Sequence, residues 1–355
     1  MSNKESYKIG SFNVKNLSYA ASGRDLDRIA NLIKRFDIVA LQEVLSEGGI
    51  LKGRNLRSIS GRAQSYERSL LARLGTNWDC RWLNPETKSK YYPYLGDDNR
   101  GEGYAFIWNT DKFELPRKDS NTLIEPYVEH RYTTQGDNVI RLIRDPGIGR
   151  FKVKGRPVEI RLITTHIVFG KPKEENFAID LPHGATKMRI NEFFILAGWI
   201  YKKVDDACMS IDASGTVATV LLGDYNLNLR TSNAKSPYVP PVAYFDSKGR
   251  PFRPQLGENN KNAPIKMYTL QDGLTTLKKD GEGLVNNFDH FSVKEDKINY
   301  IKGIYKDTKG NVRGTTVIDG IHEGVEATDS DEESKYNTYR TRVSDHLPIM
   351  MEIYL

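Results

Sequence analysis

The spacing of apolar and polar residues along this chain changes period many times, which predicts short strands separated by a few helices. Strands are predicted at residues 7–14, 37–42, 78–83, 103–109, 139–143, 150–154, 157–166, 217–223, 265–270, 287–293, 298–304 and 346–354. Helical spacing is found at residues 24–35, 62–74 and 186–204. Many strands and few long helices, arranged in two halves, predict two stacked β-sheets with helices on the outside.

Several predicted strands end in a polar side chain that can bind a metal ion or transfer a proton. These residues are Asn13, Glu43, His166, Asp224 with Asn226, and the adjacent Asp345 and His346. Each of them alone would more often be a turn-former, a cap or a hydrogen-bonded strand-end residue. Five such strand ends in one chain indicate a common site. That site would draw on residues 13 to 346, which favours one domain over the whole of 1–355.

Composition narrows the class of protein only a little. The 355 residues are 38% hydrophobic and 28% charged, as in ordinary globular proteins. The net charge of +6 suits a polyanionic partner, although many basic proteins have none. Two cysteines, Cys80 and Cys208, leave no room for a thiolate zinc site, and two buried thiols are expected rather than one disulfide.

The cellular location follows from what the sequence lacks. It shows no apolar leader at its start and no run of 18 apolar residues, so we expect a cytoplasmic protein with no membrane partner. A secreted protein whose leader has been replaced by a new Met would look the same.

The strand-end residues suggest a metal-assisted hydrolysis. Oxygen ligands without cysteine favour Mg²⁺, with Mn²⁺ or Ca²⁺ as alternatives, over zinc. Two histidines beside carboxylates suit proton transfer near neutral pH. A metal pocket next to such histidines fits the attack of water on a phosphodiester, because the metal offsets the negative charge that develops there.

The same motifs carry a family resemblance. Phe12-Asn13, Gln42-Glu43, Thr165-His166, Gly223-Asp224-Tyr225-Asn226, Asp289-His290 and Ser344-Asp345-His346 follow one another as in the endonuclease/exonuclease/phosphatase superfamily. Within it, the segments around Glu102 and Arg144 look most like those of deoxyribonuclease I-type endonucleases. The resemblance covers residues 7 to 355 and implies a four-layered α/β sandwich, with two mixed β-sheets flanked by helices.

The resemblance also implies roles for individual residues. Glu43, Asn13 and Asp345 would bind the metal. The catalytic residues would be His166 supported by Glu102, His346 supported by Asp289, and Asp224 and Asn226, with the acid and base roles of the histidines left open. Substrate would contact Arg144, Tyr104, Thr275 and Thr276.

Some parts of the chain depart from the resemblance. Leu45 stands where deoxyribonuclease I has a DNA-contacting arginine, and His290 replaces an arginine after Asp289. Residues 230–263 are expected to form a surface insertion, and the acidic residues 326–335 a mobile, solvated loop. These departures concern substrate preference rather than the phosphodiester chemistry.

We therefore expect a Mg²⁺-dependent endonuclease that cuts DNA with little sequence dependence and leaves 5′-phosphate and 3′-hydroxyl ends. Double-stranded DNA is the expected partner, and RNA remains an alternative. A first rival is a phosphoesterase of the same fold that acts on RNA or on phospholipid head groups. A second rival, from another class, is a catalytically silent nucleic-acid-binding module. The sequence does not determine the oligomeric state.

Overall fold

The computed structural model describes nineteen segments of the chain. They are residues 5–17, 23–45, 69–83, 102–116, 124–126, 132–133, 139–140, 144–167, 189, 192–193, 195–206, 215–228, 267–270, 273–279, 283–300, 305–306, 312–313, 315–322 and 332–355. The expected insertion at 230–263 lies outside these segments.

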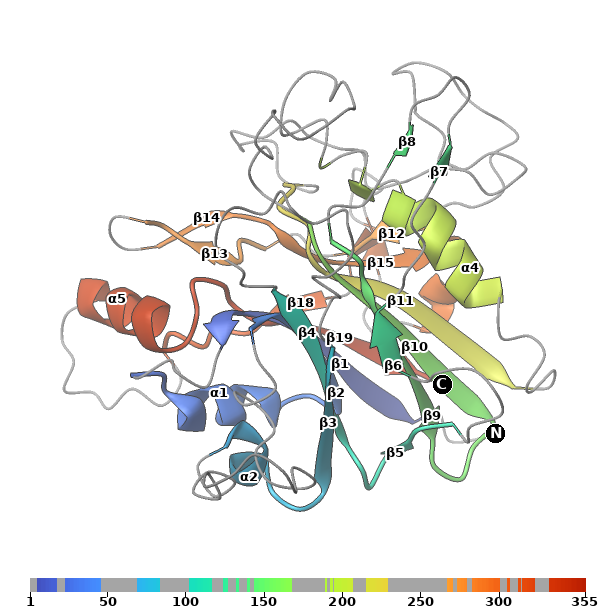
Figure 1. Cartoon of the computed structure of the whole chain (residues 1–355), viewed down its shortest axis with the longest axis horizontal. Helices are drawn as coiled ribbons and strands as arrows, with labels where there is room; N and C mark the ends of the chain where they lie inside the picture. Colours follow the sequence, from blue (N-terminus) through green and yellow to red (C-terminus); the bar gives the residue numbers. More distant parts are fainter. Residues whose placement is uncertain are drawn as a thin grey trace.

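Two mixed β-sheets form the centre of the structure (Figure 1). The first sheet has the order β18 (Thr315–Val317), β19 (Ile349–Tyr354), β1 (Ser6–Leu17), β2 (Ile38–Val44), β4 (Gly103–Asn109), β3 (Trp78–Leu83). The second has the order β12 (Met267–Thr269), β15 (Asp289–Lys294), β11 (Thr216–Asp224), β10 (Val158–His166), β9 (Gly147–Val153), β5 (Phe113–Glu114), with β6 (Ile124–Pro126) also paired to β9. In the first sheet, β1 lies between β2 and β19, so segments from opposite ends of the sequence are neighbours.

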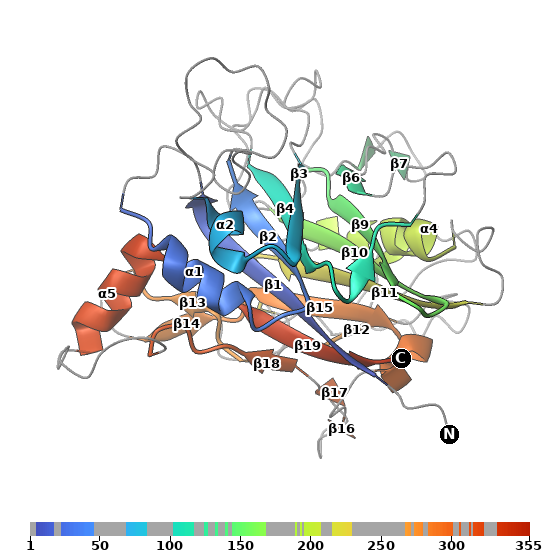
Figure 2. The ribbon, with the colours of Figure 1, turned by 90° about the horizontal axis from the view of Figure 1, so that it is seen from below.

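Three clusters of buried apolar side chains divide the protein into four layers. One cluster lies between the sheets and joins Phe106 and Ile9 of the first to Phe151 and Leu222 of the second. Another packs the first sheet against α1 (Leu26–Ile33), α2 (Leu70–Leu74) and α5 (Glu332–Arg342). A third packs the second sheet against a π-helical turn η3 (Ile195–Ile200) and α4 (Tyr201–Asp206). Figure 2 shows α1, α2 and α5 on one side of the sheets and α4 on the other. The expected four-layered sandwich is confirmed.

The first helix illustrates how local sequence sets these elements. Asp25 caps α1, because its side chain accepts a hydrogen bond from the backbone amide of Arg28. Ile29, Leu32 and Ile33 lie on one face of the helix and are buried against the first sheet. The predicted helix at 24–35 therefore forms where its apolar spacing places it.

Two sequence predictions need correction. The strand expected at 298–304 is not formed over its described part, where η4 (Glu295–Tyr300) is a 3-10 helix. This segment begins with charged residues that pair locally, Asp296 with Lys294 and with Lys297. The acidic stretch 326–335 was expected to be a loop, but residues 332–335 begin α5, whose last turn carries two arginines that suit the helix dipole. Residues 326–331 lie outside the described segments.

The remaining predicted elements are confirmed in part. Of the helix expected at 62–74, the described part contains α2, and of that at 186–204 it contains η3 and the start of α4. The strand expected at 139–143 is two residues long, β8 (Val139–Ile140), and pairs with β7 (Tyr132–Thr133). No sequence pattern predicted the hairpin β13 (Thr276–Leu277) and β14 (Leu284–Asn286), or the pair β16 (Tyr305–Lys306) and β17 (Val312–Arg313).

Two further expectations concern cysteine and membranes. Cys80 is a free, buried thiol as expected, and Cys208 lies outside the described segments. Among the described helices, none has the length and apolar character needed to cross a bilayer.

A buried charged group joins α4 to the second sheet. Glu159 accepts hydrogen bonds from Arg150 Nε at 2.6 Å and from Arg161 Nε at 2.7 Å. Arg161 also donates to the carbonyl oxygens of Val204 and Asp205 at 3.0 and 2.8 Å, at the end of α4. Burial alone would raise the pKa of Glu159, but the two guanidinium groups outweigh burial and lower it.

We expect Glu159→Gln to lower the free energy of unfolding at pH 7 by about 3 kcal/mol, because two buried guanidinium groups lose their counter-charge. The folded-state pKa of Glu159 lies below its unfolded value. The stabilisation is therefore present above the unfolded pKa and is lost as the pH falls through the folded pKa. Urea unfolding of wild type and variant at pH 7 and in acid measures both effects.

The control is Glu114→Gln, which removes a half-exposed partner at 3.8 Å from Lys152 on the same sheet. Exposed pairs contribute less than about 1 kcal/mol, so this variant should unfold almost as the wild type does. A Glu159→Gln loss that stays constant down to acid pH would contradict the assignment of the stabilisation to this carboxylate.

Candidate functional site

Three neighbouring strands of the second sheet bring three of the predicted residues together. β10 and β11 are parallel, and His166 is the register partner of Asp224. β15 runs antiparallel on the other side of β11, and its first residue, Asp289, pairs with Asp224. The end of β11 depends on Gly223, whose φ is +139° and where a Cβ atom would lie 2.0 Å from the carbonyl oxygen of Thr165. Only glycine fits there, so the chain can place Asp224 beside His166.

The first sheet contributes the other side of the site from the ends of β1 and β2 and from the segments before β4 and β19. The register between β1 and β2 shifts after Asn13. Among the described residues, the non-glycine residues with positive φ are Lys15, Asn16, Glu43 and Asn226, at 45°, 53°, 59° and 50°. Lys15, Asn16 and Glu43 lie at the ends of β1 and β2, and Asn226 follows the end of β11 in the second sheet. Such a backbone conformation is unfavourable for residues with a Cβ and is retained where the surrounding structure enforces it.

Asn13 connects the two sheets. Its side chain is fully buried, and its Nδ2 donates to Glu43 Oε1 at 2.9 Å and to Asp224 Oδ2 at 3.0 Å. Its Oδ1 accepts from the backbone amide of Lys15 at 2.9 Å. In this arrangement the amide holds two carboxylates from different sheets at a fixed separation.

Asp224 lies at the centre of the site. Its Oδ2 is 3.5 Å from Nε2 of His166 and 3.5 Å from Nε2 of His346, while its Oδ1 accepts from the backbone amide of Asn226 at 2.8 Å. Burial raises the pKa of Asp224, and the nearby carboxylate of Asp289 adds to this effect. The two imidazoles act in the opposite direction, and the net pKa remains raised.

His346 is held from several sides. Its Nδ1 is 2.8 Å from Asp289 Oδ2, its carbonyl oxygen accepts from the Tyr339 hydroxyl at 3.1 Å, and its amide donates to Ser344 Oγ at 3.0 Å. Burial opposes a charged imidazole here. The attraction of Asp289 and Asp224 outweighs burial and raises the pKa of His346 to about 10. His346 therefore presents a protonated Nε2 towards Asp224 at neutral pH.

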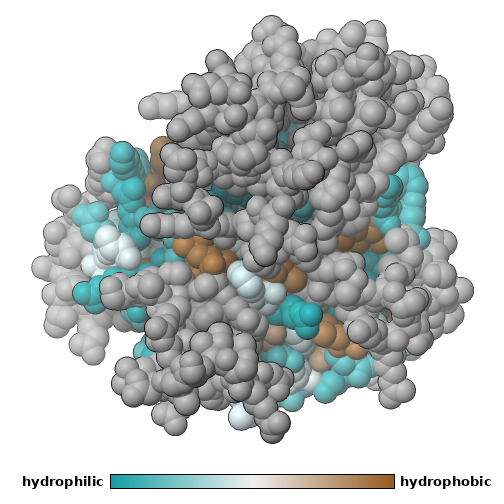
Figure 3. All heavy atoms as spheres, in the orientation of Figure 1, coloured by the Kyte–Doolittle hydropathy of each residue, from teal (hydrophilic) through white to brown (hydrophobic). Residues whose placement is uncertain are grey.

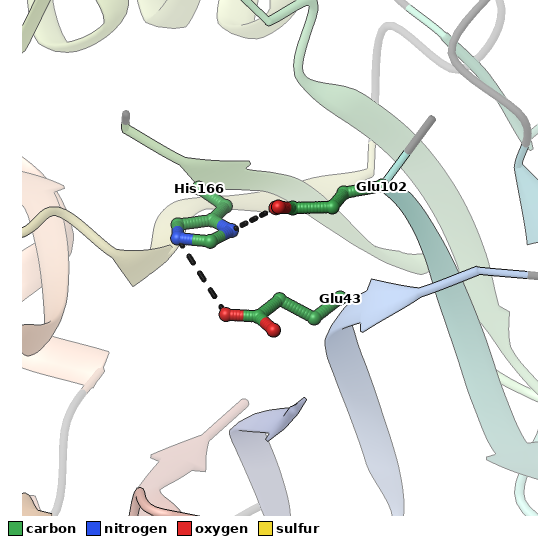
Figure 4. A group of neighbouring side chains, drawn as sticks. All are labelled: Glu43, Glu102 and His166. Carbon is green, nitrogen blue, oxygen red and sulfur yellow. Dashed lines mark ion pairs between the residues drawn. The ribbon is translucent and has the colours of Figure 1, made fainter. Parts of the chain in front are cut away.

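His166 lies between two carboxylates, with Glu102 on one side and Glu43 on the other (Figure 4). Its Nδ1 is 2.9 Å from Glu102 Oε2, and its Nε2 is 3.9 Å from Glu43 Oε1. Arg144 Nη1 lies 2.7 Å from the same Nδ1 and 2.7 Å from Glu102 Oε2. Burial would raise the pKa of Glu102, but His166 and Arg144 outweigh it and lower that pKa. The ion pair between Glu102 and Arg144 therefore fixes the position of the His166 ring from its Nδ1 side.

Two sets of side chains are close enough to share a divalent metal ion. One is Glu43, Glu102 and His166, and the other is Asp224, Asp289 and His346; within each set the ligand atoms lie within 4.8 Å of one another. Carboxylate oxygens dominate both sets, which suits a hard cation such as Mg²⁺. Of the predicted metal ligands, Glu43 belongs to the first set, and Asn13 contacts a member of each set through Glu43 and Asp224. Asp345 belongs to neither set and pairs with Lys15 Nζ at 3.2 Å.

Three residues predicted to contact substrate are engaged elsewhere. Tyr104 is buried, and its hydroxyl accepts from the backbone amide of His166 at 3.1 Å, so it supports the end of β10. Thr275 is also buried, and its Oγ1 accepts from the amides of Phe288 and Asp289. Thr276 Oγ1 accepts from the amide of Asn286 at 3.1 Å, and its backbone forms a β-bridge with His346.

The remaining predicted residues lie at the site with their polar atoms in use. Asn226 Nδ2 donates to the carbonyl oxygen of Ile167 at 2.6 Å. Arg144 contacts Glu102 and His166, so it would have to share its guanidinium with a phosphate. The structure thus brings Asn13, Glu43, His166, Asp224 and His346 into direct contact and places the other residues around them.

Sequence reasoning missed several charged residues near the site. Arg24 donates to the carbonyl oxygen of Lys15 at 2.5 Å and to those of Val14 and Val343, which fixes the strained end of β1. Arg189 is buried, and the charge of Asp224 partly offsets the lowering of its pKa by burial. The signal in the sequence for Arg189 was its place four residues before Phe193, on the apolar stripe of a predicted helix, where a cation is unusual.

Comparison with known proteins places this geometry in a family. Residues 10–242 match the model of the Endonuclease/Exonuclease/phosphatase family, and no curated protein sequence matches the chain. A family protein from Bacteroides thetaiotaomicron has a similar structure, with a TM-score of 0.50 and 16% identity over 99% of each chain.

Two other solved structures cover the chain at lower similarity. ANGEL2, a 2′,3′-cyclic phosphatase, has a TM-score of 0.48 and 14% identity over 100% of this chain and 96% of its own. Truncated TDP2 from Caenorhabditis elegans has a TM-score of 0.44 and 14% identity over 99% of this chain and 98% of its own. Neither similarity carries a conclusion about this chain.

The Lys15–Asp345 ion pair leads to a prediction about metal affinity. Lys15→Met should tighten binding of Mn²⁺ about fivefold, because removing a charge near a solvated acidic pocket changes the binding free energy by about 1 kcal/mol. Electron paramagnetic resonance of free Mn²⁺ measures the change without reference to activity. Lys154→Met, at the opposite end of β10, is the matched control. Unchanged or weaker binding by Lys15→Met would contradict competition between the lysine and the metal.

Proposed function

The chain belongs to the endonuclease/exonuclease/phosphatase family, and from this premise we propose that it is a divalent-metal-dependent endonuclease that hydrolyses DNA phosphodiester bonds. The observation that carries the proposal is the position of Asp224 Oδ2, 3.5 Å from Nε2 of both His166 and His346. A carboxylate between two imidazoles provides a base for water and two groups that can exchange protons with a phosphate. Cleavage would leave 5′-phosphate and 3′-hydroxyl ends.

In this proposal the contacts of each residue assign its catalytic role. Asp224 orients and deprotonates the attacking water. His346 is fixed through Nδ1 by Asp289, so that its Nε2 points into the site. His166 is fixed through Nδ1 by Glu102 and Arg144 and stands on the other side of Asp224. The two histidines flank the phosphate and serve as its proton donors and acceptors.

The metal would be held by Glu43, with Asn13 and Asp345 at the edge of the same pocket, and we assign it as Mg²⁺. A bound cation would neutralise the negative charge that develops on the phosphate oxygens during hydrolysis. Asn13 fixes the direction of Glu43, because its Nδ2 binds Glu43 Oε1 at 2.9 Å. The set of hard oxygen donors supports this assignment.

The rival of another class, a silent binding module, is less well supported. Each histidine retains a carboxylate partner at Nδ1, Glu102 for His166 and Asp289 for His346. A protein that only binds nucleic acid has no need to orient two imidazoles on one carboxylate. Hydrolysis of RNA or of phospholipid head groups would use the same residues, so these substrates are alternatives that the following experiment separates.

The first experiment is the nicking of supercoiled plasmid with Mg²⁺ or with EDTA. We expect open circles only with the metal. His346→Ala and His166→Ala should each lower the rate by about 10²–10⁴, because each removes a positioned acid or base. His322→Ala is the matched control, since His322 is exposed and its Nδ1 lies 2.6 Å from Oδ2 of Asp319.

A near-normal rate for His346→Ala would overturn the site assignment. Plasmid that stays intact with both Mg²⁺ and Mn²⁺ would exclude DNA as the substrate. RNA and phosphorylated lipids would then be offered to the same protein.

A second prediction concerns the metal ligand. Glu43→Gln should raise the Mg²⁺ concentration needed for half-maximal activity and weaken Mn²⁺ binding by about tenfold or more, because a charged oxygen ligand is replaced by a neutral one. Titration of Mn²⁺ by electron paramagnetic resonance gives the affinity directly. Equal affinity in the variant would remove Glu43 from the ligand set, and Glu114→Gln on β5 serves as the control.

A further inference from the structure

We propose that the β13–β14 hairpin and the end of α5 form the surface along which a polynucleotide leaves the active site. This inference rests on the proposed function and adds to it the path of the substrate. We call the surface the hairpin ridge and define it by Leu274, Lys278, Lys279, Val285 and Arg340.

The ridge starts at the catalytic residues themselves. The amide of Leu277 donates to the carbonyl oxygen of Asp345 at 2.9 Å, and the amide of Leu347 donates to that of Thr275 at 2.8 Å. Between these bonds Thr276 forms a β-bridge with His346. The hairpin then projects away from the two sheets, with α5 beside it (Figures 1 and 2). A chain bound at His346 therefore meets this hairpin next.

Cations follow one another from the site to the hairpin. Lys15 Nζ lies 3.2 Å from Asp345 Oδ2 and donates to the carbonyl oxygen of Arg340 at 3.4 Å. Arg340 Nη1 in turn donates to the carbonyl oxygen of Lys278 at 3.1 Å and to that of Lys279. These contacts place Lys15, Arg340 and the two hairpin lysines in one continuous series. Successive phosphates of a polynucleotide could bind along it.

The hairpin lysines lie on the surface of the molecule. Lys278 and Lys279 are both exposed, and within the described residues neither forms an ion pair with a carboxylate. Arg342, at the end of α5, is exposed as well. In Figure 3 the coloured atoms at the left of the view are mostly teal or pale, with some brown among them.

The same hairpin carries exposed apolar side chains. Leu274 is 37% exposed and Val285 is 44% exposed, and these are the exposed large hydrophobic residues among those that the structure describes. Single exposed apolar residues are common on protein surfaces, and here they lie on the same segment as the exposed lysines. A polynucleotide offers both kinds of contact, phosphates for the cations and the apolar faces of bases and sugars for Leu274 and Val285.

An anionic lipid surface could also attract cations beside apolar side chains. The ridge favours a polynucleotide because its cations continue without a break to the residues that would cleave a phosphodiester. A lipid surface would need the apolar residues at an outer tip, whereas Leu274 directly precedes Thr275, whose carbonyl oxygen binds the backbone of the His346 segment. Lipid binding is therefore an outcome of the test and not part of the proposal.

The test reverses the charge of the ridge with Lys278→Glu/Lys279→Glu and compares two substrates. For a DNA of about 30 nucleotides we expect kcat/KM to fall about tenfold. The salt dependence should also weaken, by roughly 0.7–0.9 in the logarithmic slope for each phosphate that the variant no longer binds. For bis(p-nitrophenyl) phosphate, which is too small to reach the ridge, we expect no change. Lys34→Glu/Lys154→Glu, two exposed lysines away from the site, is the matched control.

Binding of the same labelled oligonucleotide in EDTA, followed by fluorescence anisotropy, separates this inference from the proposed function. If the wild type cleaves no nucleic acid but the ridge variant still loses affinity for the oligonucleotide, the proposed function is wrong. Binding of a polynucleotide along the hairpin ridge is then still supported. If the ridge variant binds and cleaves as the wild type does, the inference is overturned. Preference of the wild type for anionic vesicles over the oligonucleotide would overturn it too. The milder Lys278→Gln/Lys279→Gln variant tests the same point if charge reversal impairs folding.

Discussion

The site depends on the contacts of one carboxylate oxygen, Oδ2 of Asp224. It accepts a hydrogen bond from Asn13 of the first sheet and lies 3.5 Å from one imidazole at each of two other strand ends. Burying a carboxylate without such partners would cost free energy. The fold supplies the three contacts, and the contacts in turn allow the fold to bury Asp224. Moving either sheet by one residue of register would turn Asn13 or Asp224 away from the other.

The backbone around this oxygen shows how the geometry is obtained. Lys15, Asn16, Glu43 and Asn226 all adopt positive φ, and Gly223 has no space for a side chain. The packed layers around the strand ends, together with the hydrogen bonds of Arg24 to the carbonyl oxygens of β1, hold these conformations in place. The backbone conformations of these residues are therefore unfavourable in themselves and are held in place by the surrounding structure.

Prediction from sequence succeeded where the signal was periodic and where polar residues ended apolar runs. The strands at 78–83 and 103–109 have the predicted bounds, the first because it alternates apolar residues with Asp79 and Arg81, the second because its apolar run ends at Asn109. The strand-end rule also identified Asn13, Glu43, His166, Asp224 and His346 as neighbours, since strands of stacked sheets bring their ends together.

Prediction failed where side-chain direction or short-range charge decided the outcome. Tyr104 and Thr275 face the interior, which depends on which side of a strand each occupies and on partners far along the chain. The two-residue and three-residue strands of the β13–β14 hairpin are too short for a periodic pattern. Lys15 contacts Arg340 of α5, 325 residues away in sequence. Arg24 contacts Val343 just after α5, 319 residues away. Contacts over such separations leave no local pattern in the sequence.

The position of β19 in the chain affects the order in which the protein can fold during synthesis. This strand pairs with β1 in the interior of the first sheet, and His346 lies three residues before it. During synthesis, β19 is made long after its partner strand β1. The imidazole of His346 is made just before β19. A nascent chain that ends before this segment lacks both. β1 to β4 can pair earlier, but the first sheet and the site are complete only once the β19 segment has been made.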